Sequence, residues 1–159
     1  MKQVGLDKLD QRILAILQQD GRISNQQLAE QIGLSPAACW RRVRTLEETG
    51  VITGYSAQLA PERIGQALCV LVNLSLQRHT IDSTAEIEQK VSSYPEVLQC
   101  FAVTGNADFV LRVIVPDMAS YDRFLNDKIF TLQGIAQVNS NFALREIKNT
   151  QTIPVGSAA

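Results

Sequence analysis

Apolar residues recur at helical spacing through the first fifty positions of the chain, in three short runs separated by turn residues. Asp7 can cap a first helix whose apolar stripe includes Leu9, Ile13 and Leu17. A turn signal at residues 20–21 ends that helix. The pattern therefore predicts that the chain opens with a small helical unit.

Two further short helices follow, with a tight glycine turn between them. Ser24 can cap the earlier one, Gln27 completes a capping box, and Gly33 can end the helix. Ser35 can cap the later helix, with Pro36 at the first helical position, where a missing N–H costs nothing. This layout is typical of a helix-turn-helix, whose second helix enters the DNA major groove.

The later helix has an apolar face and an arginine-rich face. At about 100° per residue, Cys39 and Leu46 point inward while Arg41 and Arg44 point to solvent, with Arg42 on the flank. Arg41 and Arg44 could each contact guanine through two hydrogen bonds, and Arg42 could hold a phosphate. The expected DNA-binding residues are Ser24, Ser35, Ala37, Arg41, Arg42, Arg44 and Thr45.

An ordinary helical hairpin remains an alternative, because it would show the same caps and the same periodicity. Two features favour DNA binding: no acidic residue occurs from position 35 to 46, and the turn is short and centred on glycine. The β-prone run at 51–55 predicts a winged variant of the motif. Trp40 lies at the edge of the helix, where we expect it to pack against a neighbouring helix or a partner subunit.

The second half of the chain mixes strands and helices. Alternating apolar residues predict a strand over 67–76, and Asp82 can cap the helix that follows. Strands are expected over 96–104 and 108–115, then a helix capped by Asp117, and a last strand over 135–147. The order β-α-β-β-α-β predicts a ferredoxin-like fold, so the chain as a whole is α+β.

The predicted sheet carries apolar residues on both faces, although its two helices cover only one. A second apolar face implies a cover, most simply the same sheet of another subunit. Such a dimer would also supply the two recognition helices that a two-fold DNA site needs. The residues that indicate this second face are Leu71, Cys100, Ala102, Val110 and Ile114.

Composition narrows the class of protein. The 159 residues are 45% hydrophobic, no apolar run is long enough to span a membrane, and the start MKQVGLDKLD lacks the apolar region of a signal peptide. We therefore expect a cytoplasmic protein without a membrane partner. The net charge of −1 is unusual for a DNA binder, so modest affinity per subunit, raised by several subunits binding together, is expected.

The reactive side chains do not indicate an enzyme. Cys39, Cys69 and Cys100 lack the spacing of a zinc site or a disulfide framework, so we expect buried, reduced thiols and no metal or cofactor, with a redox role for one thiol left open. His79, the only histidine, is expected at the surface. An enzyme subunit and an amino-acid-binding module that docks on protein remain alternatives. The latter predicts no salt-dependent DNA binding.

Several motifs, in this order and spacing, resemble the Lrp/AsnC (feast/famine) family of transcription regulators. The resemblance implies a winged DNA-binding domain over 1–54, a linker strand and hinge over 55–66, a ferredoxin-like effector-binding and oligomerisation domain over 67–148, and a tail over 149–159. It also implies dimers that assemble into octamers and regulate amino-acid metabolism genes. The matching segments are LDKLDQRILAILQQDGRIS, LAEQIGLSPAACWRRVRTLEETGVITGY, LAPERIG, PEVLQCFAVTGNADFVLRV and ALREIKNTQTIPV.

The resemblance also implies a site for a small amino-acid effector, between dimers, at the link between the second and third strands. Gly105 would let the backbone approach the ligand, and Asp108 would supply the anion for its ammonium group. A hairpin with Gly105 in its turn and Asp108 as a local cap remains the alternative. The expected effector-binding residues are Thr104, Gly105, Asn106, Ala107 and Asp108, with Asn139 and Ser140 of a neighbour.

Overall fold

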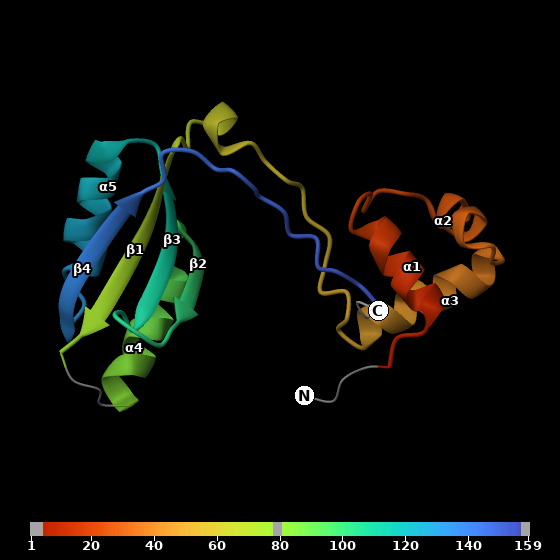
Figure 1. The fold of residues 1–159 in the computed structure, drawn as a ribbon, viewed down its shortest axis with the longest axis horizontal. Coiled ribbons are helices and arrows are strands. Elements are labelled where there is room, and N and C mark those ends of the chain that lie inside the picture. Colours follow the sequence, from red (N-terminus) through yellow and green to blue (C-terminus); the bar gives the residue numbers. More distant parts are fainter. Residues whose placement is uncertain (1–4, 78–80, 157–159) are drawn as a thin grey trace. The chain divides into compact units, whose positions relative to one another are not determined.

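Three capped helices open the chain in this computed structural model, which describes residues 5–77 and 81–156 (Figure 1). They are α1 (Lys8–Leu17), α2 (Asn25–Ile32) and α3 (Pro36–Glu48). The predicted caps are confirmed: Asp7 accepts from the amides of the first turn of α1, and Ser24 and Gln27 form a capping box on α2. Ser35 caps α3. Local hydrogen bonds at the helix starts therefore set where each helix begins.

The three helices enclose a small apolar core. Ile13 of α1, Leu28 of α2 and Cys39 of α3 are almost entirely buried, together with Leu46 near the end of α3. Arg42 adds a polar link between α3 and α1, because its Nη1 lies 2.8 Å from Asp7 Oδ2 and 2.7 Å from Asp10 Oδ1. Packing and charge together fix α3 against α1.

The predicted strand over 51–55 does not form, and neither does the linker strand expected over 55–66. Val51 and Ile52 instead pack partly against the helical core, and the Ile52 amide donates to the Leu46 carbonyl at 3.0 Å. A strand needs a hydrogen-bonded partner, and no described segment of this chain pairs with the run. A short 3₁₀ helix, η1 (Pro61–Ile64), stands in the linker instead.

The second unit has the predicted β-α-β-β-α-β order. Its elements are β1 (Leu68–Leu76), α4 (Ile81–Ser93), β2 (Val97–Ala102), β3 (Phe109–Val115), α5 (Met118–Phe124), its π-helical continuation η2 (Leu125–Ile129) and β4 (Ile135–Phe142). The strands form one antiparallel sheet in the order β2-β3-β1-β4. Figure 1 shows α4 and α5 on the same face of this sheet.

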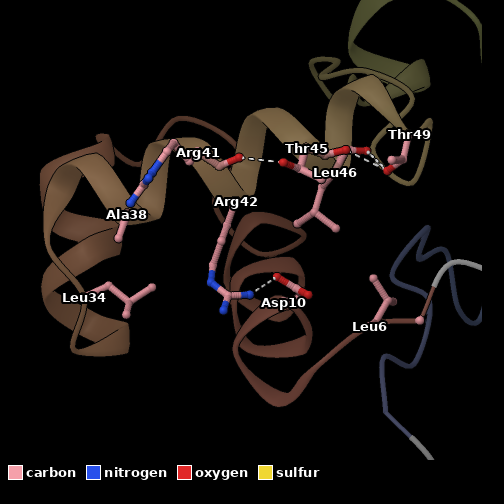
Figure 2. Close-up of a pocket in the computed structure, with 10 residues that line it drawn as sticks. Leu6, Asp10, Leu34, Ala38, Arg41, Arg42, Thr45, Leu46 and Thr49 are labelled. Atoms are coloured by element: carbon pink, nitrogen blue, oxygen red, sulfur yellow. Dashed lines mark hydrogen bonds and ion pairs between the residues drawn. The ribbon is translucent and has the colours of Figure 1, made fainter.

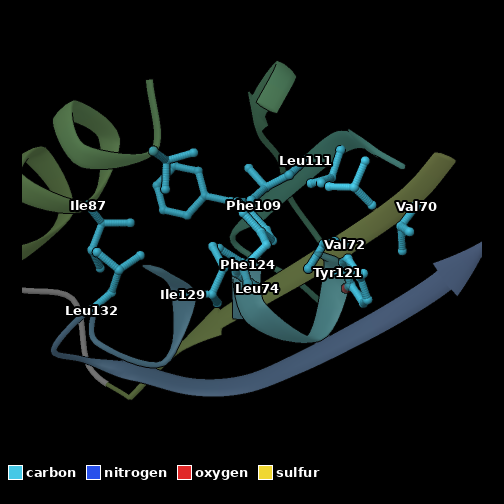
Figure 3. Packing of buried hydrophobic residues seen from close by; sticks show 13 residues of the cluster. Val70, Val72, Leu74, Ile87, Phe109, Leu111, Tyr121, Phe124, Ile129 and Leu132 are labelled. Carbon is cyan, nitrogen blue, oxygen red and sulfur yellow. The ribbon is translucent and has the colours of Figure 1, made fainter. Parts of the chain in front are cut away.

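The core of the second unit lies between the sheet and those helices. Val72 and Leu111 from the sheet are fully buried against Ile87 of α4 and Phe124 of α5, as Figure 3 shows. Because alternate strand residues point to opposite faces, the same strands present their other residues away from the helices. That second surface is called the open face below.

A β-bulge in β2 changes which residues lie on the open face. Val97 pairs with Val113, but Gln99 pairs with Arg112, so the extra residue reverses the alternation along β2. Cys100 therefore packs against the helix-covered core, and Ala102, in register with buried Phe109, lies on that same side. The prediction that these two residues line the second face is wrong.

The other residues predicted to form the second apolar face do lie on it, as the pairing of the strands shows. Leu71, Val110 and Ile114 all point to the open face. Phe101, which the sequence pattern did not single out, lies beside Val110 and is 54% exposed, while Leu71 is 43% exposed. Arg112 also lies on this face and pairs with Glu146 at 2.8 Å. The open face therefore combines exposed apolar side chains with the Arg112–Glu146 ion pair and with amides such as Asn73 and Asn139.

Several predicted element boundaries shift. The last strand ends at Phe142 rather than 147, since only the Ala143 amide continues the pairing with β1. α4 begins at Ile81, so Asp82 is not its preceding cap residue. Asp117 does cap α5, as predicted. His79 falls outside the described residues, so its expected surface position stays a prediction.

The chain divides into two units, Met1–Gln58 with Lys148–Ala159, and Leu59–Ile147. The tail therefore packs with the helical unit. The Gln18 side chain donates from Nε2 to the Ile153 carbonyl at 3.0 Å and accepts from the Ile153 amide at 2.7 Å. Val155 packs partly against the helical core. No helix among the described residues is long and apolar enough to cross a membrane.

Replacing Gln18 by alanine should release the tail. Both hydrogen bonds to Ile153 would be lost, each worth about 1 kcal/mol, so the Ile153 amide should exchange its hydrogen roughly thirtyfold faster. Amide hydrogen exchange measured residue by residue tests this. The exposed neighbour Gln19 provides the control, and equal exchange rates in Gln18→Ala and Gln19→Ala would contradict the tail contact.

The Asp7 charge should stabilise the helical unit in a pH-dependent way. The hydrogen bond from the Asp10 amide, assisted by the Arg42 guanidinium, lowers the pKa of Asp7 below its ordinary 3.8. The stabilisation is thus present above that ordinary value and lost as the pH falls through the lower, folded-state pKa. The Tm difference between wild type and Asp7→Asn should be largest near neutral pH, and it should shrink as the pH falls below 3.8 and through the lower pKa of the folded state.

Trp40 is the only tryptophan and lies in the helical unit, so its fluorescence reports the melting of that unit. Glu30→Gln removes an exposed charge of the same unit and serves as the control. A Tm difference for Asp7→Asn that stays constant from neutral to acidic pH would refute the role of the charge.

Candidate nucleic-acid interface and effector loop

The turn between α2 and α3 fixes the direction in which α3 leaves the helical core. Gly33 has φ 75°, a left-handed conformation that glycine adopts without strain. The side-chain amide of Asn25, at the start of α2, donates to the Pro36 carbonyl at 2.8 Å and joins the two helix starts. Sequence reasoning did not assign Asn25 this role, since the contact spans the turn.

The outer face of α3 is exposed as the helical spacing predicts. Ala37, Arg41, Arg44 and Thr45 are all exposed, whereas Cys39 on the opposite side is buried. The Thr45 hydroxyl donates to the Arg41 carbonyl at 2.9 Å, so it serves the helix backbone in this structure. These four residues of α3, all predicted to face DNA, thus share one solvent-facing surface.

Arg42 has a different environment from the other two arginines. Figure 2 shows its side chain reaching from α3 to Asp10 on α1, while Arg41 runs back along α3 toward Ala38. Both arginines line a hollow of about 540 Å³, to which Asp10 of α1 also contributes. Arg42 donates hydrogen bonds to the carboxylates of Asp10 and Asp7, and these bonds raise the pKa of Arg42. Arg42 is held as a structural cation, and its phosphate contact stays a prediction.

The two serines predicted at the interface are engaged as helix caps. Ser24 Oγ accepts from the Gln27 amide at 3.2 Å and donates to Gln27 Oε1 at 2.9 Å. Ser35 Oγ accepts from the Ala38 amide at 3.3 Å. Both lie at helix N-termini, where backbone N–H groups favour phosphate oxygens, so a DNA contact remains compatible with their positions.

Arg44 is held between two neighbours on its own helix. Its guanidinium carbon lies 5.1 Å from the centre of the Trp40 ring, and its Nε donates to Glu48 Oε1 at 2.7 Å. Trp40 is 51% exposed, so about half of its surface is left uncovered by this chain, and its packing against a partner subunit stays a prediction. The signal that sequence reasoning missed is the four-residue spacing of Trp40, Arg44 and Glu48, which puts them on one helix face.

The loop between β2 and β3 is tied to the end of β1. Gly105 has φ 120°, and the neighbouring Asn106 carbonyl accepts from Ser75 Oγ at 3.1 Å. Asp108 donates its amide to the Leu74 carbonyl at 2.9 Å and accepts from the Leu76 amide at 2.7 Å through Oδ2. Asp108 therefore anchors this loop, whatever else its carboxylate binds.

Asn139 and Ser140 of β4 point to opposite sides of the sheet. Asn139 pairs with Asn73 and lies on the open face, whereas Ser140 faces the helices and bonds to the Tyr121 hydroxyl at 2.5 Å. Within one chain, β1 separates β4 from the loop residues Thr104, Gly105, Asn106, Ala107 and Asp108 by two strand spacings, roughly 10 Å. One chain therefore does not bring the two groups together.

The cysteines show no sign of reactivity or metal binding among the described residues. Cys39 is buried, and Cys69 and Cys100 are partly buried free thiols. Burial raises the pKa of the Cys39 and Cys100 thiols, which keeps both protonated near neutral pH. No group of three or more histidine, cysteine or acidic side chains in the described part of the chain could hold a metal ion.

Both units match known families. Residues 6–53 match the winged helix-turn-helix DNA-binding family, and residues 69–153 match the Lrp/AsnC ligand binding domain. The Bkd operon transcriptional regulator of Pseudomonas aeruginosa is 43% identical over 142 residues, which cover 89% of this chain and 93% of that relative.

Solved structures agree with the whole architecture. An AsnC family transcriptional regulator from Agrobacterium tumefaciens superposes with a TM-score of 0.90 at 38% identity, over 94% of this chain and 97% of its own. A transcriptional regulator from Neisseria meningitidis, solved as a complex with L-Met, gives 0.89 at 37% identity over the same shares. With its helix-turn-helix unit and its four-stranded α+β unit, the chain belongs to the Lrp/AsnC family of DNA-binding transcriptional regulators.

Proposed function

We propose that this regulator reads double-stranded DNA with the outer face of α3 and controls genes of amino-acid metabolism. The observation that carries the proposal is the exposed face holding Ala37, Arg41, Arg44 and Thr45, built on a capped and anchored helix. Arginines on a recognition helix match guanine O6 and N7 in the major groove. DNA binding, rather than catalysis, is the activity we assign, and we place it in the cytoplasm, where the DNA lies.

A small amino acid is the proposed effector, bound at the loop of residues 104–108. Gly105 has open space beside its backbone, since apart from its two chain neighbours no atom lies within 4 Å of where a Cβ would stand. Asp108 offers a carboxylate at the same loop for an ammonium group. The L-Met complex of the Neisseria regulator supports this class of ligand. Asn139 and Ser140 would complete the site from a neighbouring subunit.

Self-association is the third part of the proposal. The open face exposes Leu71 and Phe101, and a second copy of the same sheet would cover them. A dimer presents two copies of α3 to two half-sites, and further assembly to an octamer would bring more half-sites together. An effector bound between dimers would then favour one assembly by its differential affinity for the two states.

Arg41→Ala and Arg44→Ala should each weaken specific DNA binding. Loss of one contact to guanine costs about 1–3 kcal/mol, so Kd for the DNA upstream of the regulator's own gene should rise roughly tenfold. Gel shifts at several salt concentrations measure both the affinity and its salt dependence. Arg123→Ala on α5 removes the same charge from the other unit and should leave Kd nearly unchanged.

Unchanged Kd in both variants would remove α3 from the DNA interface. Binding by the wild-type protein that does not weaken as salt rises would contradict DNA binding itself and would favour a module that docks on protein.

Asp108→Asn should abolish the response to the effector while leaving DNA affinity intact. Asparagine keeps an oxygen that can accept from the Leu76 amide, but it removes the charge that would hold an ammonium group. Each of the twenty amino acids is titrated into the gel shift. The one that is the effector should change the affinity of the wild-type protein for DNA by about 5–150-fold. Asp122→Asn on α5 serves as the control for loss of a negative charge.

If the same amino acid changes the DNA affinity of the Asp108→Asn variant as strongly as that of wild type, the effector site lies elsewhere. In that case the 104–108 loop is only a hairpin connection that Asp108 caps.

A further inference from the structure

Trp40, Arg44 and Glu48 form a row along one side of α3, each four residues from the next. The Arg44 guanidinium lies between the other two, 5.1 Å from the Trp40 ring centre and bonded through Nε to Glu48 at 2.7 Å. An arginine over an aromatic face and beside a carboxylate is held by a cation–π attraction and an ion pair at once. Trp40 and Glu48 therefore hold the side chain of Arg44 from two sides.

We propose that Trp40 is a positioning residue that fixes the guanidinium of Arg44 for reading a base pair. The inference rests on the DNA-reading function proposed above and adds a specificity determinant to it. Trp40 acts through Arg44 in this scheme and makes no base contact of its own.

The way in which Arg44 is held suits bidentate recognition. The hydrogen bond to Glu48 uses Nε, and among the described residues the two terminal amino groups of Arg44 have no hydrogen bond to another side chain. Those two groups form the planar fork that matches guanine O6 and N7. A guanidinium fixed in advance loses less conformational freedom when it binds, so the fork discriminates more sharply between bases.

The exposure of Trp40 supports a role outside the protein core. The indole is 51% exposed and is not part of the apolar cluster that holds the three helices together. A hollow of about 440 Å³ lies beside it, lined also by Arg44 and Tyr55. A tryptophan needed only for packing would bury more of its surface, whereas the aromatic face of Trp40 contacts the guanidinium of Arg44.

The test uses the full-length protein and a pool of random DNA duplexes. Wild type selects its preferred sequence, and Arg44→Ala identifies the base pair at which preference is lost. Discrimination at that base pair is then measured by fluorescence anisotropy for Trp40→Leu and Trp40→Phe. We expect Trp40→Leu to lose about tenfold in discrimination and Trp40→Phe to retain most of it, because phenylalanine keeps an aromatic face.

Two further measurements separate positioning from structure. In the Arg44→Ala background, Trp40→Leu should add no further loss, since the residue it positions is gone. The salt dependence of binding should be the same for Trp40→Leu and wild type, because no charge is removed. Trp40→Leu should also keep the circular dichroism spectrum of wild type.

If Trp40→Leu discriminates at that base pair as well as wild type does, the inference is wrong, whereas the DNA-reading function is not affected. A Trp40→Leu loss that persists in the Arg44→Ala background would also overturn the inference, because it would mean that the indole touches DNA itself. If wild type enriches no sequence at all, the DNA-reading function fails and this inference fails with it.

Discussion

The position of the recognition helix depends on the left-handed backbone conformation at Gly33. For a residue with a Cβ, that φ would cost about 1–2 kcal/mol. Only residues 33–35 connect α2 to α3, so a different backbone conformation at Gly33 would change the direction of α3. The Asn25 amide and the Ser35 cap hold the chain on either side of the turn. Because the helical core is small, these few polar contacts decide where the outer face of α3 points, and hence which side chains can meet DNA.

Local signals in the sequence predicted most of this unit correctly. Caps at Asp7, Ser24 and Ser35 involve residues within three positions of each other, so the sequence contains both partners of each bond. The burial of Cys39 and the exposure of Arg41 likewise follow from helical periodicity alone. The order of elements in the second unit was predictable for the same reason, since strand alternation and turn residues are local patterns.

Features that depend on distant partners were not predictable. The sequence placed Arg42 on the flank of the helix, but it could not show that the side chain meets the carboxylates of Asp7 and Asp10, because the spacing within α3 does not reveal partners on another helix. The bulge after Val97 reversed the faces of Cys100 and Ala102, and a bulge is a feature of the pairing with β3, which the residues of β2 alone do not indicate. The run at 51–55 has β propensity but lacks a partner strand, and propensity alone does not form a sheet.

The loop of residues 104–108, where we propose that the effector binds, is joined to the sheet through one carboxylate. Asp108 already accepts a bond from the last residue of β1, so an ammonium group bound there would share or replace that contact. A change at this point acts on β1, which is the central neighbour of both β3 and β4. The open face, the loop and β4 all meet at β1, so a ligand that shifts this strand alters the surface on which subunits would associate. In the proposed scheme, effector binding and assembly would thereby be coupled through a single element.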